Sequence, residues 1–192
     1  SLGNPKLNVL NISEIAKVAH LANLPLIVDN TVPTPFLLRP IDFGADIIVY
    51  STTKYIGGQG NSLGGAVVDA GKFNWSNGKF PEFTQPNPAY HGLNLWEALG
   101  SSAFIAKIRL EGLRDFGATA SPFNSFQIIQ GLETLPIRLK KHSENALELA
   151  KWLQRHPKVE WVNYPGLEDH PTYQLAQKYL PNGVSGILTF GV

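Results

Sequence analysis

The sequence has 192 residues, of which 43% are hydrophobic and 16% are charged, and it carries a formal net charge of +1 and no cysteine. A chain of this length and composition can bury a sizeable core, while the lack of cysteine excludes disulfides, thiolate metal sites and thiol nucleophiles. Neither nucleic acid nor a membrane surface is an expected partner, because the sequence contains no Lys/Arg cluster apart from residues 138–141. A small-molecule partner fits the low net charge better. We expect a cytoplasmic protein, since no apolar run approaches a membrane span and the N-terminal residues lack the basic and apolar regions of a signal peptide.

The first predicted element is a helix near the N-terminus. Apolar residues recur at helical spacing from Ile12 to Ala22, which predicts a helix packed by one face on a sheet. Asn11 precedes this run and Glu14 follows three residues later, a variant of the capping box. Asn11 is therefore the predicted N-cap.

Two strands follow in a βαβ-like rhythm. Residues 24–28 form a short apolar run that leads into Asp29, and prolines then break the chain before a second apolar run, starting near Ala45, ends in Ser51. This rhythm predicts a mostly parallel sheet with a right-handed connection, so Asp29 and Ser51 should emerge at the same edge. Residues 64–69 are predicted to form a third strand.

The second half of the chain is predicted to be mainly helical. A loop from Phe73 to Pro88, rich in aromatic residues and proline, is expected to cover a site or to form an interface. The expected helices and strands are helices at residues 101–114, 122–130, 134–155 and 171–179, and strands at 159–163 and 186–192. Ser121 is the predicted N-cap of the second of these helices, with Pro122 at its first position. No methionine occurs and the pattern stops without a closing element, so we expect a fragment of a longer protein.

Three kinds of reactive group gather at the predicted strand ends. Asp29 supplies a carboxylate, Ser51, Thr52 and Thr53 supply hydroxyls, and Lys54 supplies an amine. A pyridoxal phosphate site needs all three: a lysine for the Schiff base, hydroxyls for the phosphate, and a carboxylate that keeps the pyridine nitrogen protonated. Taken alone, the same residues also fit a solvated lysine, a turn-forming aspartate and ordinary caps, and both interpretations stay open at this point.

Longer stretches of the chain resemble a known family. Residues 28–31 (Val-Asp-Asn-Thr), residues 44–58 around Lys54, and Gly131 to Leu135 with the segment that follows look like the Cys/Met-metabolism family of fold-type I pyridoxal phosphate enzymes. The loop from Gly71 to Gly92 is similar to the O-acetylhomoserine sulfhydrylase branch of that family. The resemblance covers essentially the whole chain.

The resemblance implies a fold and a division into domains. The expected fold is α/β, with a partial, mostly parallel sheet and flanking helices, plus the start of a smaller α+β domain. Residues 1–133 would be the C-terminal part of the large cofactor-binding domain. Residues 134–192 would be a long linking helix and the beginning of the small C-terminal domain.

The resemblance also implies roles for individual residues. Lys54 would be the Schiff-base lysine, and Asp29 would be the partner of the ring nitrogen of pyridoxal 5'-phosphate. Ser51 and Thr53 would bind the phosphate, and Asn4 would lie beside the ring hydroxyl. No metal is implied.

Three positions depart from the common pattern of the family. Tyr50 and Gln59 stand where histidines are frequent, and Thr52 stands where a small or aliphatic residue is frequent. None of these changes removes a required group, but Gln59 implies different contacts in its loop.

The implied activity is γ-replacement on O-acetyl-L-homoserine with sulfide or a related sulfur donor, which gives homocysteine. Cystathionine γ-synthase and methionine γ-lyase activities of the same family stay open as alternatives. In the family, further groups of the site lie before Ser1 and after Val192, and full-length members are homotetramers built from dimers. We therefore expect this fragment alone to be inactive, and a non-catalytic structural fragment is the alternative of another class.

One further motif predicts a different enzyme. Residues 60–64 (Gly-Asn-Ser-Leu-Gly) match the nucleophile elbow of serine hydrolases, with Ser62 as the nucleophile. An elbow requires a strand before the serine and a helix after it, whereas here a glycine-rich loop precedes Ser62 and a predicted strand follows. The context therefore disfavours a hydrolase.

Overall fold

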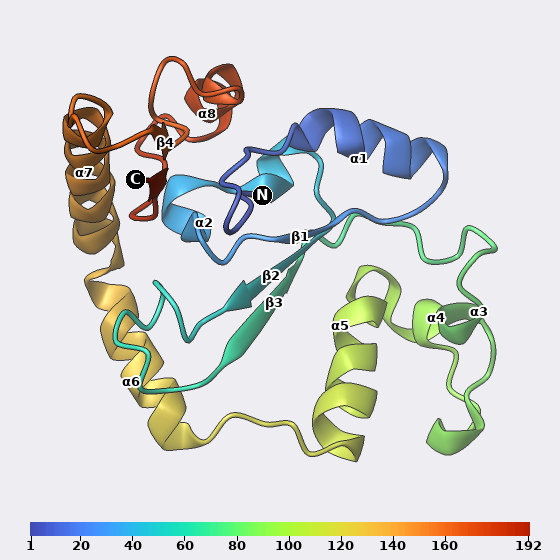
Figure 1. Ribbon diagram of the computed structural model, residues 1–192. Coiled ribbons are helices and arrows are strands. Elements are labelled where there is room, and N and C mark those ends of the chain that lie inside the picture. The colour runs from blue at the N-terminus through green and yellow to red at the C-terminus, as the bar shows by residue number, and fades with distance from the viewer.

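A short three-stranded sheet lies at the centre of the computed structural model, which describes residues 1–192 (Figure 1). Its strands are β1 (Ile27–Asp29), β2 (Ile47–Ser51) and β3 (Gly65–Asp69), in the order β1-β2-β3. β1 is parallel to β2, and β3 is antiparallel to β2. The sheet is thus mixed within this chain, because β2 returns to β3 through a loop without the helical crossover that joins parallel neighbours.

The central strand β2 separates two apolar clusters. Ile48 and Tyr50 belong to the larger cluster, together with Leu139. Ile47 belongs to a smaller cluster around Trp75. Successive side chains of a strand point to opposite faces of the sheet, so one strand contributes to both cores.

The N-terminal third of the chain contains one long helix and two short ones: α1 (Ile12–Leu21), α2 (Thr34–Leu37) and the 3₁₀ helix η1 (Pro40–Phe43). The predicted helix α1 is confirmed, with Ile12 and Ala16 buried. Asn11 occupies the N-cap position, as predicted, but its side chain makes no capping hydrogen bond. Its Oδ1 instead accepts a hydrogen bond from the hydroxyl of Tyr179 at 2.7 Å.

The segment from Phe73 to Pro88 and the residues after it fold into a small helical unit with its own core. Trp75 is buried there, and its ring stacks on Phe104 with the centroids 5.0 Å apart. The elements of this region are α3 (Pro81–Thr84), η2 (Pro88–Tyr90), α4 (Leu95–Leu99), η3 (Gly100–Ser102), α5 (Ala103–Lys107) and the π-helical segment η4 (Ile108–Asp115). The aromatic residues of the predicted loop are therefore core residues of this unit.

The C-terminal part is built on two consecutive helices, α6 (Pro122–Glu133) and α7 (Leu135–Gln154), followed by β4 (Trp161–Asn163), α8 (Tyr173–Tyr179) and β5 (Thr189–Gly191). Ser121 caps α6 as its sequence predicts, since its Oγ accepts the N–H of Asn124 at 3.1 Å. β4 and β5 pair antiparallel. The predicted boundary after residue 133 falls between α6 and α7 and stays a prediction.

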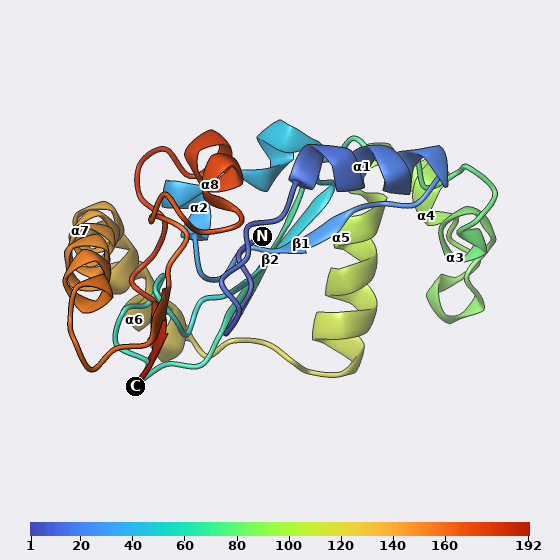
Figure 2. The ribbon, with the colours of Figure 1, turned by 45° about the horizontal axis from the view of Figure 1, so that its top comes forward.

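The helices lie on both sides of the sheet. In both ribbon views α7 lies on one side and α5 on the other, and an extended segment connects α5 to α6 (Figure 1, Figure 2). None of these helices combines the length and the apolar composition needed to cross a membrane. β2 ends toward α6 and α7 (Figure 1), and the turn after it contacts α7, because Arg138 donates to the carbonyl oxygen of Tyr55 at 2.9 Å.

Candidate active site

Lys54 lies on a tight turn directly after β2. Its backbone N–H donates to the carbonyl oxygen of Ser51 at 3.3 Å, and the N–H of Gly58 donates to the carbonyl oxygen of Lys54 at 2.8 Å. Thr52 and Thr53 of this turn are buried, whereas Lys54 is exposed. The turn is therefore packed against the protein while it presents the amine of Lys54 at the surface.

Asp29 ends the neighbouring strand, as the parallel arrangement of β1 and β2 predicts. The N–H of Ser51 donates to Oγ1 of Thr31 at 2.8 Å, which joins the chain after β1 to the end of β2. Oδ1 of Asp29 accepts the N–H of Thr31, also at 2.8 Å. These contacts fix the Asp29 carboxylate at the same edge of the sheet as Ser51.

Two open pockets lie at this edge. The first, here called the Asp29 pocket, has a volume of about 500 Å³, and its lining includes Asn4, Asp29, Ser51 and Lys54. The second, here called the Thr53 pocket, has a volume of about 460 Å³, shares Asn4 and Lys54 with the first, and adds Thr53. Every site residue predicted from the sequence thus borders one of the two pockets, and Lys54 borders both.

The two hydroxyls predicted to bind phosphate differ in their surroundings. The Oγ1 atom of Thr53 accepts the N–H of Gly64 at 3.0 Å and donates to the Gly64 carbonyl oxygen at 3.3 Å. The hydroxyl of Ser51 lines the Asp29 pocket and is only partly buried. Ser51 is therefore the more accessible donor. Thr53 can donate to a ligand only when its hydroxyl gives up the hydrogen bond to the Gly64 carbonyl oxygen.

The whole chain matches one protein family. The family described as Cys/Met metabolism PLP-dependent enzymes matches residues 1–192. The chain belongs to this family.

Two curated relatives support the match. The chain is 52% identical to the O-acetyl-L-homoserine sulfhydrylase of Leptospira meyeri over 196 residues, which cover 98% of this chain and 44% of the relative. It is 51% identical to the homocysteine synthase of Schizosaccharomyces pombe, over 100% of this chain and 45% of the relative.

A solved structure of the family has the same fold. The crystal structure of a Campylobacter jejuni protein described as an O-acetylhomoserine (thiol)-lyase, which carries N'-pyridoxyl-lysine-5'-monophosphate, superimposes with a TM-score of 0.95 at 41% identity. The match covers 99% of this chain and 48% of that protein. The predicted fold class is thereby confirmed, and the chain spans less than half the length of the relatives that it matches.

The chemistry of the Asp29 pocket fits the cofactor of this family. An amine, a carboxylate and a hydroxyl, from Lys54, Asp29 and Ser51, all line it. These are the groups that a pyridoxal phosphate enzyme needs to bind the aldehyde carbon, the ring nitrogen and the phosphate. The donor set therefore suits pyridoxal phosphate.

The site also contains residues to which the sequence assigned no role. Tyr55 and His142 line the Thr53 pocket, and their rings lie 5.6 Å apart between centroids. Arg138 donates to the carbonyl oxygens of Tyr55 and Ile56. His142 and Arg138 lie within the stretch that resembles the family, but that pattern alone does not say that α7 reaches the turn of Lys54.

Two of the residues that depart from the common family pattern, Tyr50 and Gln59, make contacts outside the two pockets. Tyr50 is buried, its hydroxyl lies 3.4 Å from Nδ2 of Asn30, and burial raises the pKa of that phenol. Gln59 is exposed, and its Oε1 accepts from Nδ2 of Asn61 at 3.2 Å. Neither side chain lines the Asp29 pocket or the Thr53 pocket.

The serine of the elbow-like motif is not arranged as a nucleophile. Ser62 is buried, and its hydroxyl donates to Oε1 of Gln127 on α6. The chain continues from Ser62 into β3, so the strand-to-helix turn of an elbow is absent. In residues 1–192 no group of three or more His, Asp or Glu side chains is arranged to hold a metal ion.

Proposed function

We propose that the protein carrying this chain performs a pyridoxal phosphate-dependent γ-replacement on O-acetyl-L-homoserine, with sulfide or a related sulfur donor, to give homocysteine, with acetate leaving from Cγ. The observation that carries the proposal is the meeting of Lys54, Asp29 and Ser51 in one pocket at the ends of two parallel strands. Ligands of open α/β sheets bind at the carboxyl ends of the strands. The names of the sulfhydrylase and homocysteine synthase relatives support the choice of reaction.

In this proposal each residue has a defined role. Lys54 binds the cofactor covalently through its amine, and the carboxylate of Asp29 pairs with the ring nitrogen. Ser51 and Thr53 bind the phosphate, and Asn4 lies by the ring hydroxyl. When bound, the cofactor supplies an electron sink for the electron pair that remains when a proton leaves the substrate Cα.

In this proposal Lys54 carries the proton, and Asp29 sets the charge of the cofactor's ring nitrogen. Lys54, released when the substrate amine takes its place, accepts the Cα proton at its Nζ and later returns a proton. Its side chain is exposed on a turn and borders both pockets, which supports such movement. Asp29 keeps the ring nitrogen protonated because a carboxylate stabilises a neighbouring cation. The contact of its Oδ1 with the N–H of Thr31 supports this role by orienting the carboxylate.

The proposal extends to partners and location. The substrates are a small amino acid and a sulfur donor, and the whole protein is a cytoplasmic homotetramer. Pocket volumes of about 500 and 460 Å³ suit small molecules, and a net charge of +1 gives no support to a polyanionic partner.

Replacement of the lysine tests the proposal. In the protein that carries this chain, Lys54→Ala should abolish both the visible absorbance of bound cofactor and turnover of O-acetyl-L-homoserine with sulfide. Lys158→Ala is the matched control, because Lys158 is an exposed lysine in a turn that borders neither pocket. Retained turnover in Lys54→Ala would overturn the proposal.

The same assay separates the related activities. Cysteine supplied in place of sulfide reports cystathionine formation, and methionine supplied alone reports γ-elimination. Ser62→Ala tests the hydrolase alternative, and we expect it to retain turnover because the Ser62 hydroxyl is bound to Gln127 inside the protein.

A further inference from the structure

The side chain of Arg138, in the first turn of α7, reaches back to the turn that carries Lys54. Its Nη1 donates to the carbonyl oxygen of Tyr55 at 2.9 Å, and its Nη2 donates to the carbonyl oxygen of Ile56 at 3.3 Å. These two carbonyl groups follow Lys54 directly along the chain. Arg138 thus holds the backbone one and two residues beyond the candidate cofactor lysine.

The same guanidinium is fixed to the junction between α6 and α7. Its Nη2 donates to the carbonyl oxygen of Gly131 at 2.7 Å, and its Nε donates to Oγ1 of Thr134 at 3.0 Å. The planar fork of an arginine can reach several acceptors at once without losing its own geometry. One side chain therefore joins the helix junction to the Lys54 turn.

Gly58 leaves the room that this contact needs. A Cβ atom added at Gly58 would lie 2.7 Å from Cζ and 2.8 Å from Nη1 of Arg138. The φ angle of Gly58 is +82°, which also favours glycine. The turn and the guanidinium therefore fit closely, and a side chain at Gly58 would displace one of them.

The charge of Arg138 is balanced by carbonyl groups and by no carboxylate. None of the ion pairs of the chain includes Arg138. Burial lowers the pKa of its guanidinium, although arginine keeps its charge in proteins. Hydrogen bonds from a charged donor are stronger than neutral ones, so this is a firm restraint on the turn.

A second contact joins the same helix to the same turn. The ring of Tyr55 lies 5.6 Å from the ring of His142, centroid to centroid. Residues 138 and 142 are one helical turn apart on α7 and so share a face of the helix. That face of α7 thus meets the backbone beyond Lys54 at one point and a neighbouring side chain at another.

We propose that Arg138 is a positioning residue for Lys54. It holds the turn against the α6–α7 junction so that the Lys54 amine remains between the Asp29 pocket and the Thr53 pocket. The role of Lys54 in this inference rests on the proposed function, whereas the restraint of the turn by Arg138 does not.

Three substitutions test the inference. Arg138→Met removes all four hydrogen bonds, and Arg138→Lys keeps the charge but loses the planar fork. Arg155→Met is the matched control, because the Nε of Arg155, at the other end of α7, donates only to the carbonyl oxygen of Lys151 at 3.1 Å. Should Arg138→Met fail to fold, Arg138→Gln replaces it with the same expected results.

The first measurement is amide hydrogen exchange without cofactor, at Gly57 and Gly58 in the turn and at Ile48 in β2 as a reference for global opening. We expect Arg138→Met to raise exchange at the two glycines about tenfold relative to Ile48, with Arg138→Lys intermediate and Arg155→Met unchanged. Equal exchange in Arg138→Met and Arg155→Met overturns the inference.

The second measurement is reductive labelling of lysines with pyridoxal phosphate and borohydride, read as the share of label on Lys54. This share should fall in Arg138→Met and recover in part in Arg138→Lys, and the pH midpoint of the visible absorbance should shift in the same order. An unchanged share of label on Lys54 would leave Arg138 a purely structural residue and overturn the inference. Failure of the proposed function would appear separately, as retained turnover in Lys54→Ala.

Discussion

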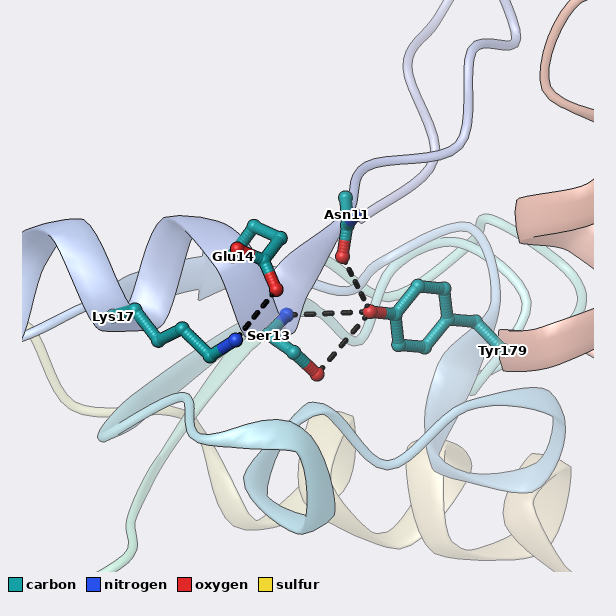
Figure 3. A network of polar contacts seen from close by, with 5 residues as sticks. All are labelled: Asn11, Ser13, Glu14, Lys17 and Tyr179. Carbon is teal, nitrogen blue, oxygen red and sulfur yellow. Dashed lines mark hydrogen bonds and ion pairs between the residues drawn. The ribbon is translucent and has the colours of Figure 1, made fainter.

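The hydroxyl of Tyr179 in α8 donates to Oδ1 of Asn11 at 2.7 Å and so joins two residues 168 positions apart (Figure 3). The same oxygen accepts the backbone N–H of Ser13 at 3.3 Å, in the first turn of α1. The first N–H groups of a helix have no partner within the helix. A tyrosine from the C-terminal part of the chain therefore caps α1 in place of a local side chain.

We expect Tyr179→Phe to lower the free energy of unfolding by about 1–2 kcal/mol. The substitution leaves the N–H of Ser13 without its partner, while the buried ring can keep its edge-on contact with Phe43 at 4.7 Å between centroids. Urea unfolding should show a lower midpoint with an unchanged slope. Tyr173→Phe in the same helix, whose hydroxyl makes no hydrogen bond within the protein, is the control and should leave the midpoint unchanged. Equal midpoints in the two variants would contradict this account of the cap.

The contrast between the caps of α1 and α6 shows what local sequence can predict. Ser121 caps α6 as predicted because its partner, the N–H of Asn124, is three residues away. Asn11 has an equally good capping sequence, but Tyr179 competes for its side chain from a distant part of the chain. Sequence patterns foresee contacts within one helical turn and miss those that depend on tertiary packing.

The candidate site likewise combines features that local sequence predicts with features that depend on tertiary packing. The placement of Lys54 and Asp29 at one edge of the sheet was predictable, because Asp29 ends one apolar strand, Lys54 follows the next, and the ends of parallel strands meet at one edge. The antiparallel direction of β3 and the contact of Arg138 with the Lys54 turn were not predictable. The acceptors of Arg138 are backbone carbonyl groups, which every residue carries and which therefore leave no mark in the sequence.

His170 should make the stability of the protein decrease as the pH falls into the acid range. Its Nδ1 accepts the N–H of Thr172 at 3.1 Å, and its Nε2 lies 2.9 Å from Oδ1 of Asn163, so the neutral ring satisfies both neighbours. Burial lowers the pKa of His170 below its usual value of 6.5, the nearby Asp169 opposing this shift. As the pH falls below about 6.5, the unfolded chain binds a proton that the folded chain does not, and stability therefore decreases until the lower folded pKa is passed.

The measurement is the free energy of unfolding as a function of pH. We expect the wild-type curve to fall on the acid side of about 6.5, and His170→Gln to have a flatter curve in that interval. His91→Gln is the control, because His91 lies exposed in a distant loop. An acid slope that is the same in wild type and His170→Gln would assign the effect to other groups.

Gly131 on α6 should not tolerate a side chain. A Cβ atom there would collide with the carbonyl oxygen of Gly57, in the turn that follows Lys54. Both sides of this contact are backbone, so neither can move away as a flexible side chain would. We expect Gly131→Ala to destabilise the protein by about 1–3 kcal/mol, as overpacking of a close contact typically does. It should also displace the Lys54 turn, and so weaken cofactor binding.

Gly112→Ala is the matched control for this substitution. Gly112 also lies in a helical segment, but an added Cβ would meet only Cγ2 of Ile108 at 3.8 Å, an ordinary van der Waals distance. Alanine is favoured over glycine in helices by about 1 kcal/mol, so this variant should be as stable as the wild type or slightly more stable. Urea unfolding of both variants, with cofactor titration followed by visible absorbance, measures the difference. Wild-type stability and cofactor affinity in Gly131→Ala would mean that α6 and the Lys54 turn can separate without cost, which the close backbone contact between Gly131 and Gly57 argues against.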